Sequence, residues 1–189
     1  GQDSMTFSEL DTVFDRPKTK LISVICSNKT ITKDHVLRIE FVKKLKQFFG
    51  EKIDFFGRGF NEIDDKLDAL QDYRFHVALE NTSRKHYFTE KLSDPIIAGC
   101  FPIYYGCPNI SDYLPEEAYA HIDIQNFEAS VATIQNAING NYDLVYRDAL
   151  RQAKYQIMYH HNLYPMIVKA IDNLEVGMYG GKKIPYLVG

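Results

Sequence analysis

A threonine followed directly by an acid and a base, Thr89-Glu90-Lys91, is the residue pattern in this chain with the clearest chemical meaning. A threonine at the start of a helix can cap it through its hydroxyl, which would set the next two residues beside unpaired backbone N–H groups. A glutamate suits the positive end of the helix dipole, whereas a lysine there costs about 0.3–1 kcal/mol. One explanation is a bound phosphate that the helix N-terminus and the ammonium both attract. The alternative is that Lys91 pairs with Glu90 or points into water.

Two apolar runs flank this triplet and predict the elements that position it. The pattern predicts a buried strand over residues 74–79, a helix over 89–98 and a second strand over 101–105. Together these elements form a βαβ unit. The loop over residues 80–88 then leaves the first strand at the carboxyl edge of a parallel sheet, where open α/β folds bind ligands.

A second cation comes from the first predicted βα unit, a strand over residues 21–26 and a helix over 35–49. Arg38 shares a stripe with Val42 and Leu45 at helical spacing, so it should face the sheet. A guanidinium in that position needs a partner. It either binds a phosphate with two hydrogen bonds near the sheet's edge, or lays its stem on the core and sends its head to solvent.

The glycine-rich turn Gly57-Arg58-Gly59 follows a predicted strand over residues 52–56. Its glycines would let the backbone approach a ligand closely. Glu62 stands where a dinucleotide-binding motif has its third glycine, so the turn by itself is weak support for such a site. Residues 63–73 are predicted to form a short acidic helix with a solvated face.

The remaining pattern predicts one α/β domain over residues 21–176, preceded by a flexible segment over 1–20 and followed by a flexible or docking tail over 177–189. Within the domain we expect a short strand and three helices after the central unit, over residues 119–122, 127–138, 142–160 and 163–174. The histidine at position 76 alternates with apolar residues in a strand, which favours a satisfied core histidine over a catalyst.

The composition excludes several classes of protein. The chain has 189 residues, of which 45% are hydrophobic and 25% charged, as is usual for a folded domain. A net charge of −3 argues against a general nucleic-acid surface, and no run is long and apolar enough to suggest a membrane span. Three cysteines, an odd number, predict free thiols in a reducing compartment and hence a cytoplasmic or membrane-peripheral location; a missing upstream anchor would instead favour the Golgi lumen.

The central residues resemble the signature of family 10 glycosyltransferases, the α1,3/α1,4-fucosyltransferases. The segments that carry the resemblance are Ala78-Leu79-Glu80-Asn81-Thr82, Tyr87-Phe88-Thr89-Glu90-Lys91, Ala98-Gly99 and Pro102-Ile103-Tyr104-Tyr105-Gly106. Two weaker segments are similar as well, namely Ser27-Asn28 with Arg38 and Phe41, and Phe56-Gly57-Arg58.

The resemblance implies a Rossmann-like three-layer domain with a mostly parallel sheet, the C-terminal half of a GT-B fold. It also implies glycosylation chemistry: inverting transfer of fucose from GDP-fucose to a hydroxyl of an acceptor glycan. Arg38 and Lys91 would stabilise the leaving diphosphate. Glu90 would hold sugar or ribose hydroxyls, although a helix-dipole role is an adequate alternative.

Further residues are placed in the nucleotide-sugar pocket by the resemblance alone: Asn81, Tyr87, Thr89 and Arg58. For Tyr87 without the resemblance, core packing would be the better interpretation. The sequence has no Asp-x-Asp motif and no clustered Cys/His spacing, so we expect no metal clamp on the diphosphate and no covalently bound cofactor.

Two departures qualify the resemblance. Asp94-Pro95 lies inside the predicted helix where family members usually carry helix formers, and the proline predicts a kink or a restart. The base that an inverting transferase needs is implied to come from an N-terminal acceptor half, which no stretch here resembles. The alternatives are therefore a nucleotide-sugar-binding module without catalysis, or a Rossmann-like interaction domain in which the two cations are surface charges.

Overall fold

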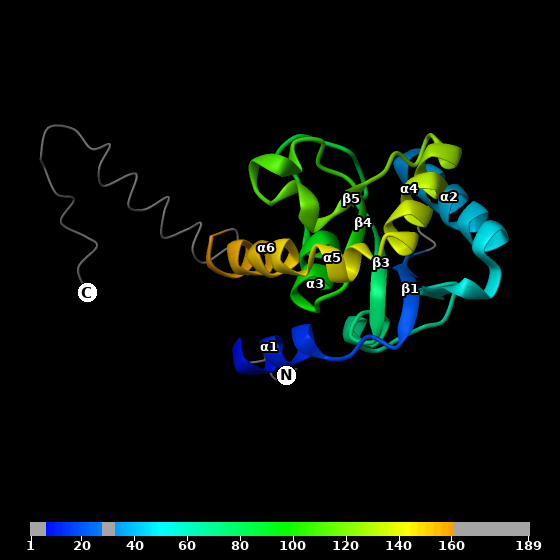
Figure 1. Cartoon of the computed structure of the whole chain (residues 1–189). Coiled ribbons are helices and arrows are strands. Elements are labelled where there is room, and N and C mark those ends of the chain that lie inside the picture. The colour runs from blue at the N-terminus through cyan, green and yellow to red at the C-terminus, as the bar shows by residue number, and fades with distance from the viewer. Residues whose placement is uncertain (1–6, 28–32, 161–189) are drawn as a thin grey trace, which may run out of the picture. The chain divides into compact units, whose positions relative to one another are not determined.

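The computed structural model describes residues 7–27 and 33–160, in which helices cover both faces of a parallel sheet (Figure 1). The sheet has five strands in the order β2-β1-β3-β4-β5, and every neighbouring pair is parallel. The strands are β1 (Lys20–Ile25), β2 (Ile53–Phe56), β3 (Tyr73–Leu79), β4 (Phe101–Tyr105) and β5 (Ala120–His121). The predicted three-layer α/β class with a parallel sheet is confirmed.

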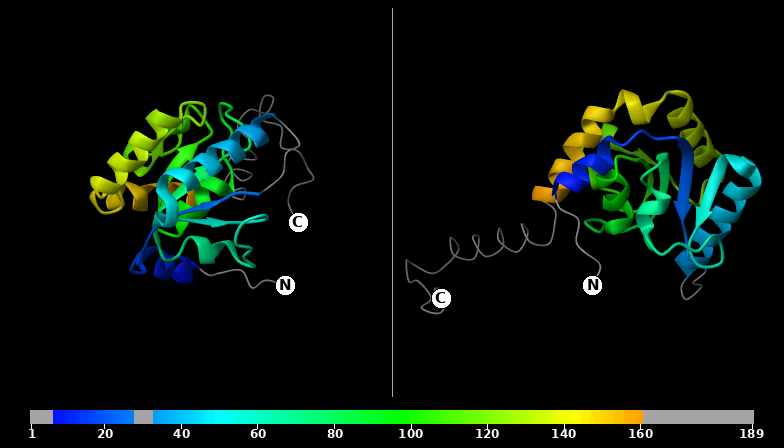
Figure 2. Two further views of the ribbon diagram at one scale, coloured as in Figure 1. Left: turned by 90° about the vertical axis from the view of Figure 1, so that its right-hand side faces the viewer. Right: turned by 90° about the horizontal axis from the view of Figure 1, so that it is seen from below.

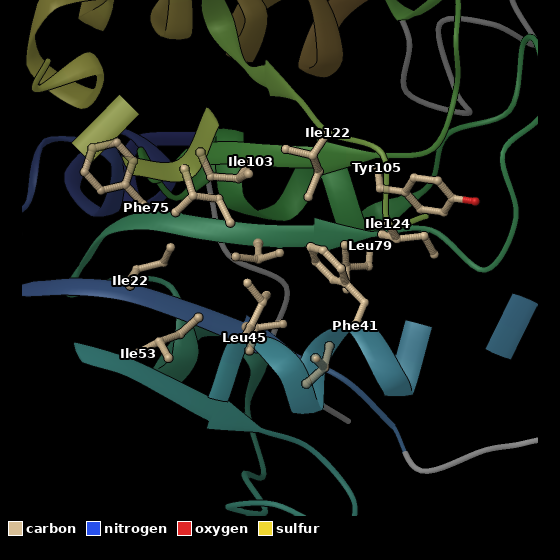
Figure 3. Packing of buried hydrophobic residues seen from close by; sticks show 14 of the residues in the cluster. Ile22, Phe41, Leu45, Ile53, Phe75, Leu79, Ile103, Tyr105, Ile122 and Ile124 are labelled. Atoms are coloured by element: carbon tan, nitrogen blue, oxygen red, sulfur yellow. The ribbon is translucent and has the colours of Figure 1, made fainter. Parts of the chain in front are cut away.

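One face of the sheet carries the main hydrophobic core. Successive side chains of a strand point to opposite faces, so Ile22 and Val24 of β1 lie on the same face and pair in register with Phe75 and Val77 of β3. The helices α2 (Lys33–Phe49) and α4 (Phe127–Asn139) cover this face. Figure 3 shows the side chains that α2 sends towards the strands, among them Phe41.

The opposite face is covered by α3 (Glu90–Ile97), with α1 (Phe7–Asp15) beside it (Figure 2). Leu92 and Ile96 of α3 are fully buried. Phe14 of α1 is fully buried too, and the guanidinium carbon of Arg147 lies 4.2 Å from the centre of its ring. The expectation of a flexible segment over residues 1–20 is therefore wrong for α1, because the buried Phe14 and the ion pairs of Asp11 with Lys154 and of Asp15 with Arg151 tie this helix to the domain.

Three further predictions about local structure need correction. Residues 63–73 form only a short 3-10 turn, η2 (Lys66–Ala69), which Asp65 caps by accepting the backbone N–H of Leu67 at 2.9 Å. The predicted helix over residues 142–160 is two helices, α5 (Tyr142–Val145) and α6 (Arg147–Tyr159). The helix α3 runs through Pro95 as one element, so the restart, one of the two alternatives predicted there, does not occur.

Short 3-10 turns complete the described chain: η1 (Gly50–Lys52), η3 (Ile110–Asp112) and η4 (Glu116–Ala118). The predicted helix over residues 163–174 and the tail over 177–189 lie outside the described residues. Contacts divide the chain after Lys154 into two units, and the sheet with its covering helices through α5 belongs to the first. Within the described ranges, none of the helices combines the length and the apolar character needed to cross a bilayer.

Gly99 and Gly50 allow a matched test of how α1 packs. Both have positive φ, 71° and 55°, so alanine at either position incurs the cost of the left-handed conformation, about 1–2 kcal/mol. At Gly99 a Cβ would also lie 2.3 Å from the carbonyl oxygen of Phe14, whereas at Gly50 it would meet nothing within 4 Å. We expect Gly99→Ala to lower the free energy of unfolding by clearly more than Gly50→Ala, measured by urea denaturation. Equal losses would contradict the close packing of α1.

Candidate functional site

A pocket of about 380 Å³ lies at the carboxyl edge of the sheet, where β1 and β3 end. The chain order reverses here, because β2 lies on one side of β1 and β3 on the other. The chain leaves β1 towards α2 on one face and leaves β3 towards α3 on the other. The two connections separate and leave a crevice, which is where open α/β sheets of this strand order bind ligands.

Arg38 reaches this pocket from α2 and is only 5% exposed. Its Nη1 donates a hydrogen bond to Oδ1 of Asn81, the side chain that follows β3. Its Nε is buried and finds no acceptor within the described part of the chain. Burial raises the pKa of the neighbouring Cys26 thiol, although the charge of Arg38 opposes this shift. A buried, incompletely bonded guanidinium in a pocket wall is suited to an anionic ligand.

The N-terminus of α3 forms the facing wall. Thr89 caps the helix, its Oγ1 accepting the backbone N–H of Lys91 at 3.3 Å. The carboxylate of Glu80, whose side chain is fully buried, accepts the backbone N–H of Thr89 at 2.7 Å and its hydroxyl at 2.8 Å. Because the hydroxyl proton goes to Glu80, the lone pairs of Thr89 Oγ1 face Lys91, whose Nζ lies 3.3 Å away. Glu80 thus orients the hydroxyl of Thr89, and this hydroxyl in turn accepts a hydrogen bond from the ammonium of Lys91 and holds it in place.

The ammonium of Lys91 also pairs with its neighbour Glu90, Nζ to Oε1 at 3.2 Å, and lies 3.8 Å from Oε2 of Glu80. Burial works to raise the pKa of Glu90, but nearby lysine ammonium groups outweigh it and the pKa lies below its ordinary value. Burial raises the pKa of Glu80 despite the hydrogen bonds from Thr89. Lys91 therefore pairs with Glu90, as the simpler alternative predicted, and it also lines the pocket.

His76 lies on the pocket floor, and its tautomer follows from its partners. Ser23 Oγ lies 2.6 Å from the carbonyl oxygen of Ala69, to which it donates its only proton, and 2.8 Å from Nδ1 of His76. The imidazole must therefore donate through Nδ1, which leaves Nε2 unprotonated. Burial lowers the pKa of His76 to about 3, so the ring is neutral. The prediction of a satisfied core histidine is confirmed.

The pocket brings together four of the residues that the sequence singled out: Arg38, Asn81, Glu90 and Lys91. Thr89 is not part of the lining, but it caps the helix that presents the last two. Tyr87 is 38% exposed and outside the lining, so the core-packing interpretation of this residue is wrong. Arg58 is exposed in the turn after β2 and is also outside the lining.

No site role was predicted for several residues that the structure places at the site, among them Glu80, Lys66 and His35. Glu80 belongs to a segment that carries the family resemblance, but only its burial and its hydrogen bonds with Thr89 reveal that it organises the N-terminus of α3. Lys66 was assigned to a solvated helix, yet it lines the pocket from η2. His35, on the first turn of α2, lines it as well. Helical spacing from Arg38 could have indicated His35, whereas no local signal marks Lys66.

No group of three or more His, Cys, Asp or Glu side chains is placed to hold a metal ion in the ranges that the structure describes. The three cysteines at positions 26, 100 and 107 are free, as predicted, and all three are buried.

A parallel α/β domain with a pocket at its switch point has the Rossmann-like fold. The model of "Glycosyltransferase family 10 (fucosyltransferase) C-term" matches residues 15–161. The chain therefore belongs to glycosyltransferase family 10, and it corresponds to the C-terminal part of that family's proteins.

Individual relatives agree with this assignment. The chain is 39% identical over 75 residues to a putative fucosyltransferase-like protein of Arabidopsis thaliana, a match that covers 38% of this chain and 15% of the relative. It is 27% identical over 146 residues to 4-galactosyl-N-acetylglucosaminide 3-alpha-L-fucosyltransferase 9 of Homo sapiens, which covers 74% of this chain and 39% of the relative. The chain thus spans well under half the length of these relatives.

A solved structure of an alpha1,3-fucosyltransferase with GDP-fucose has a similar fold. The TM-score is 0.54 at 23% sequence identity, and the likeness covers 73% of this chain and 39% of that one. This likeness confirms that the domain is one half of a GT-B fold.

The lowered pKa of His76 predicts a specific loss of stability in acid. An unfolded histidine has a pKa near 6.5, whereas the pKa of folded His76 is about 3. The contribution of the neutral ring to the free energy of unfolding is therefore fully present above pH 6.5 and is lost as the pH falls from 6.5 towards 3. The loss approaches about 1.4 kcal/mol per pH unit. In His76→Asn this slope should disappear, whatever the offset at neutral pH. Urea denaturation of both proteins from about pH 7 to about pH 4 measures the difference, and parallel curves would contradict the assignment.

Proposed function

We propose that this chain is the donor-binding half of an inverting α1,3-fucosyltransferase and that its pocket binds GDP-fucose. The observation that carries the proposal is the convergence of Arg38 from α2 and Lys91 from α3 on one pocket at the switch point. These two residues belong to helices on opposite faces of the sheet. Their meeting in one pocket therefore depends on the strand order as well as on the position of each residue in its helix. The GDP-fucose bound to the fucosyltransferase of similar fold supports the choice of donor.

In the proposed reaction the acceptor hydroxyl oxygen forms a bond to the anomeric carbon of fucose while the bond from that carbon to the β-phosphate oxygen breaks. GDP leaves with the electron pair, so negative charge grows on the diphosphate. Arg38 and Lys91 would stabilise this charge, together with the capped N-terminus of α3. The buried position of Arg38 matters here, because an ion pair in a low-dielectric wall is screened little by water.

The other residues would orient the donor. Glu90 carries a lowered pKa and so remains an acceptor for ribose or sugar hydroxyls. Asn81 holds the guanidinium of Arg38 and lines the same pocket. Roles for Tyr87 and Arg58 in contacting the nucleotide-sugar would require these exposed side chains to turn towards the bound donor, and Thr89 would act through the helix that it caps.

A second candidate is a nucleotide-sugar-binding module that does not turn over. The matched region covers 39% of the human relative, and the base that removes the acceptor's proton is expected in an N-terminal acceptor half. The two candidates share the pocket and the donor, and they differ only in catalysis. A turnover assay of the whole gene product with GDP-fucose and N-acetylglucosamine-containing acceptors separates them: released GDP with a fucosylated product supports the transferase, and donor binding without product supports the module.

Donor binding is tested first by calorimetry with GDP, GDP-fucose and UDP. We expect both guanine nucleotides to bind and UDP to bind more weakly. Equal affinity for all three would indicate a generic phosphate site. An unchanged melting temperature in millimolar GDP would favour a Rossmann-like interaction domain without a nucleotide.

Replacing either cation should weaken donor binding. We expect Arg38→Ala and Lys91→Ala each to reduce the affinity for GDP by about 1.5–3 kcal/mol, the range of a charge-assisted hydrogen bond. Lys85→Ala is the control, since this exposed lysine belongs to the loop after β3 but does not line the pocket. A variant that binds GDP as tightly as the parent removes its residue from the proposed site.

A further inference from the structure

Lys66 crosses from η2 to α3 at the pocket that holds Arg38 and Lys91. Its Nζ lies 3.3 Å from Oδ2 of Asp94 and 3.7 Å from Oε1 of Glu90. All five side chains line the same pocket. Lys66 therefore joins two elements that are separated in sequence by β3 and the loop after it.

The backbone below Lys66 is fixed to the sheet. Ala69, the last residue of η2, is fully buried, and its carbonyl oxygen accepts the hydroxyl proton of Ser23 from β1 at 2.6 Å. At the other end of the turn, Asp65 accepts the backbone N–H of Leu67. The lysine stem thus starts from an anchored turn, while its ammonium end, with a side chain 54% exposed, is free to change partner.

Lys66 is the most exposed of the three cationic side chains Arg38, Lys66 and Lys91 that line the pocket, and it pairs there with the carboxylates of Asp94 and Glu90. Lys91 has a further carboxylate close by, that of the buried Glu80, 3.8 Å from its Nζ. Burial raises the pKa of Asp94, although Lys66 opposes this, so the carboxylate depends on the ammonium as its counter-ion. Ion pairs between exposed side chains contribute little to stability. A diphosphate, which carries more charge than one carboxylate, would compete well for Lys66.

We propose that Lys66 is a third cationic residue of the donor site, which exchanges Asp94 and Glu90 for the diphosphate of the nucleotide. The inference rests on the proposed function. Before the nucleotide arrives, Asp94 acts as an internal substitute for the ligand's charge and competes with it. The exchange also releases Glu90 from its contact with Lys66.

The two partners should therefore have opposite effects on binding. Lys66→Ala should weaken the binding of GDP about tenfold, the equivalent of about 1.4 kcal/mol. Lys66→Arg keeps the cation and should bind within about threefold of the parent. Asp94→Asn removes the competitor and should bind GDP about threefold more tightly, because less interaction is lost on exchange. Calorimetry at low ionic strength measures all four proteins, since salt screens an exposed ammonium.

Lys43→Ala is the matched control, because Lys43 is an exposed lysine of α2 outside the pocket lining. It should bind GDP like the parent, and thermal denaturation of each variant confirms that the fold is kept. If the parent binds GDP and Lys66→Ala binds it equally well, the role of Lys66 is refuted while the proposed function stands. If Asp94→Asn binds more weakly than the parent, the exchange is refuted. A parent that does not bind GDP at all overturns the proposed function and this inference with it.

Discussion

The site depends on a constraint of chain path. A parallel sheet buries both of its faces, so successive connections must supply helices to each side. In this domain the reversal occurs between β1 and β3, whose connections lead to α2 on one face and α3 on the other. Neither connection can cover the gap between the two strand ends. The pocket is therefore a consequence of how the sheet is covered, and the chemistry depends on which side chains the two helices present to it.

The side chains presented there pose an electrostatic problem that the domain solves with short-range partners. A guanidinium that is 5% exposed and an ammonium that lines the same pocket both carry positive charge, which opposes folding unless partners compensate it. Asn81 accepts a hydrogen bond from Arg38, and the buried Glu80 and the exposed Glu90 hold Lys91. Such partners keep the cations ordered while leaving hydrogen-bonding capacity, as at Nε of Arg38. Preorganised charge of this kind is what stabilisation of a leaving diphosphate requires.

Glu80 illustrates how the first layer of the site depends on a second. It does not line the pocket, yet its carboxylate accepts a hydrogen bond from the hydroxyl of Thr89 and so directs the lone pairs of that oxygen towards Lys91. The same buried position that makes this carboxylate effective also raises its pKa. Glu80 thus orders the N-terminus of α3, but burying its carboxylate costs solvation free energy. Similar logic applies to Ser23, which fixes both the tautomer of His76 and the carbonyl of Ala69 under η2.

The sequence by itself determined the parallel α/β class, the position of the central βαβ unit and the capping role of Thr89, because these follow from local periodicity and from hydrogen-bonding types that act within a few residues. It also singled out Arg38 and Lys91, since a cation on an inward stripe and a lysine in the first turn of a helix each conflict with a local rule. It failed at α1, whose Phe14 is buried against residues far away in the sequence, and at residues 63–73, which form only the short turn η2 before β3 begins at Tyr73. The family resemblance implied that both cations act on one diphosphate, and the tertiary structure places them on one pocket. Only the tertiary structure decided that Glu80 organises Lys91 and that Lys66 lines the same pocket. Such meetings depend on strand order and on which face each helix covers, and no local pattern encodes these two properties.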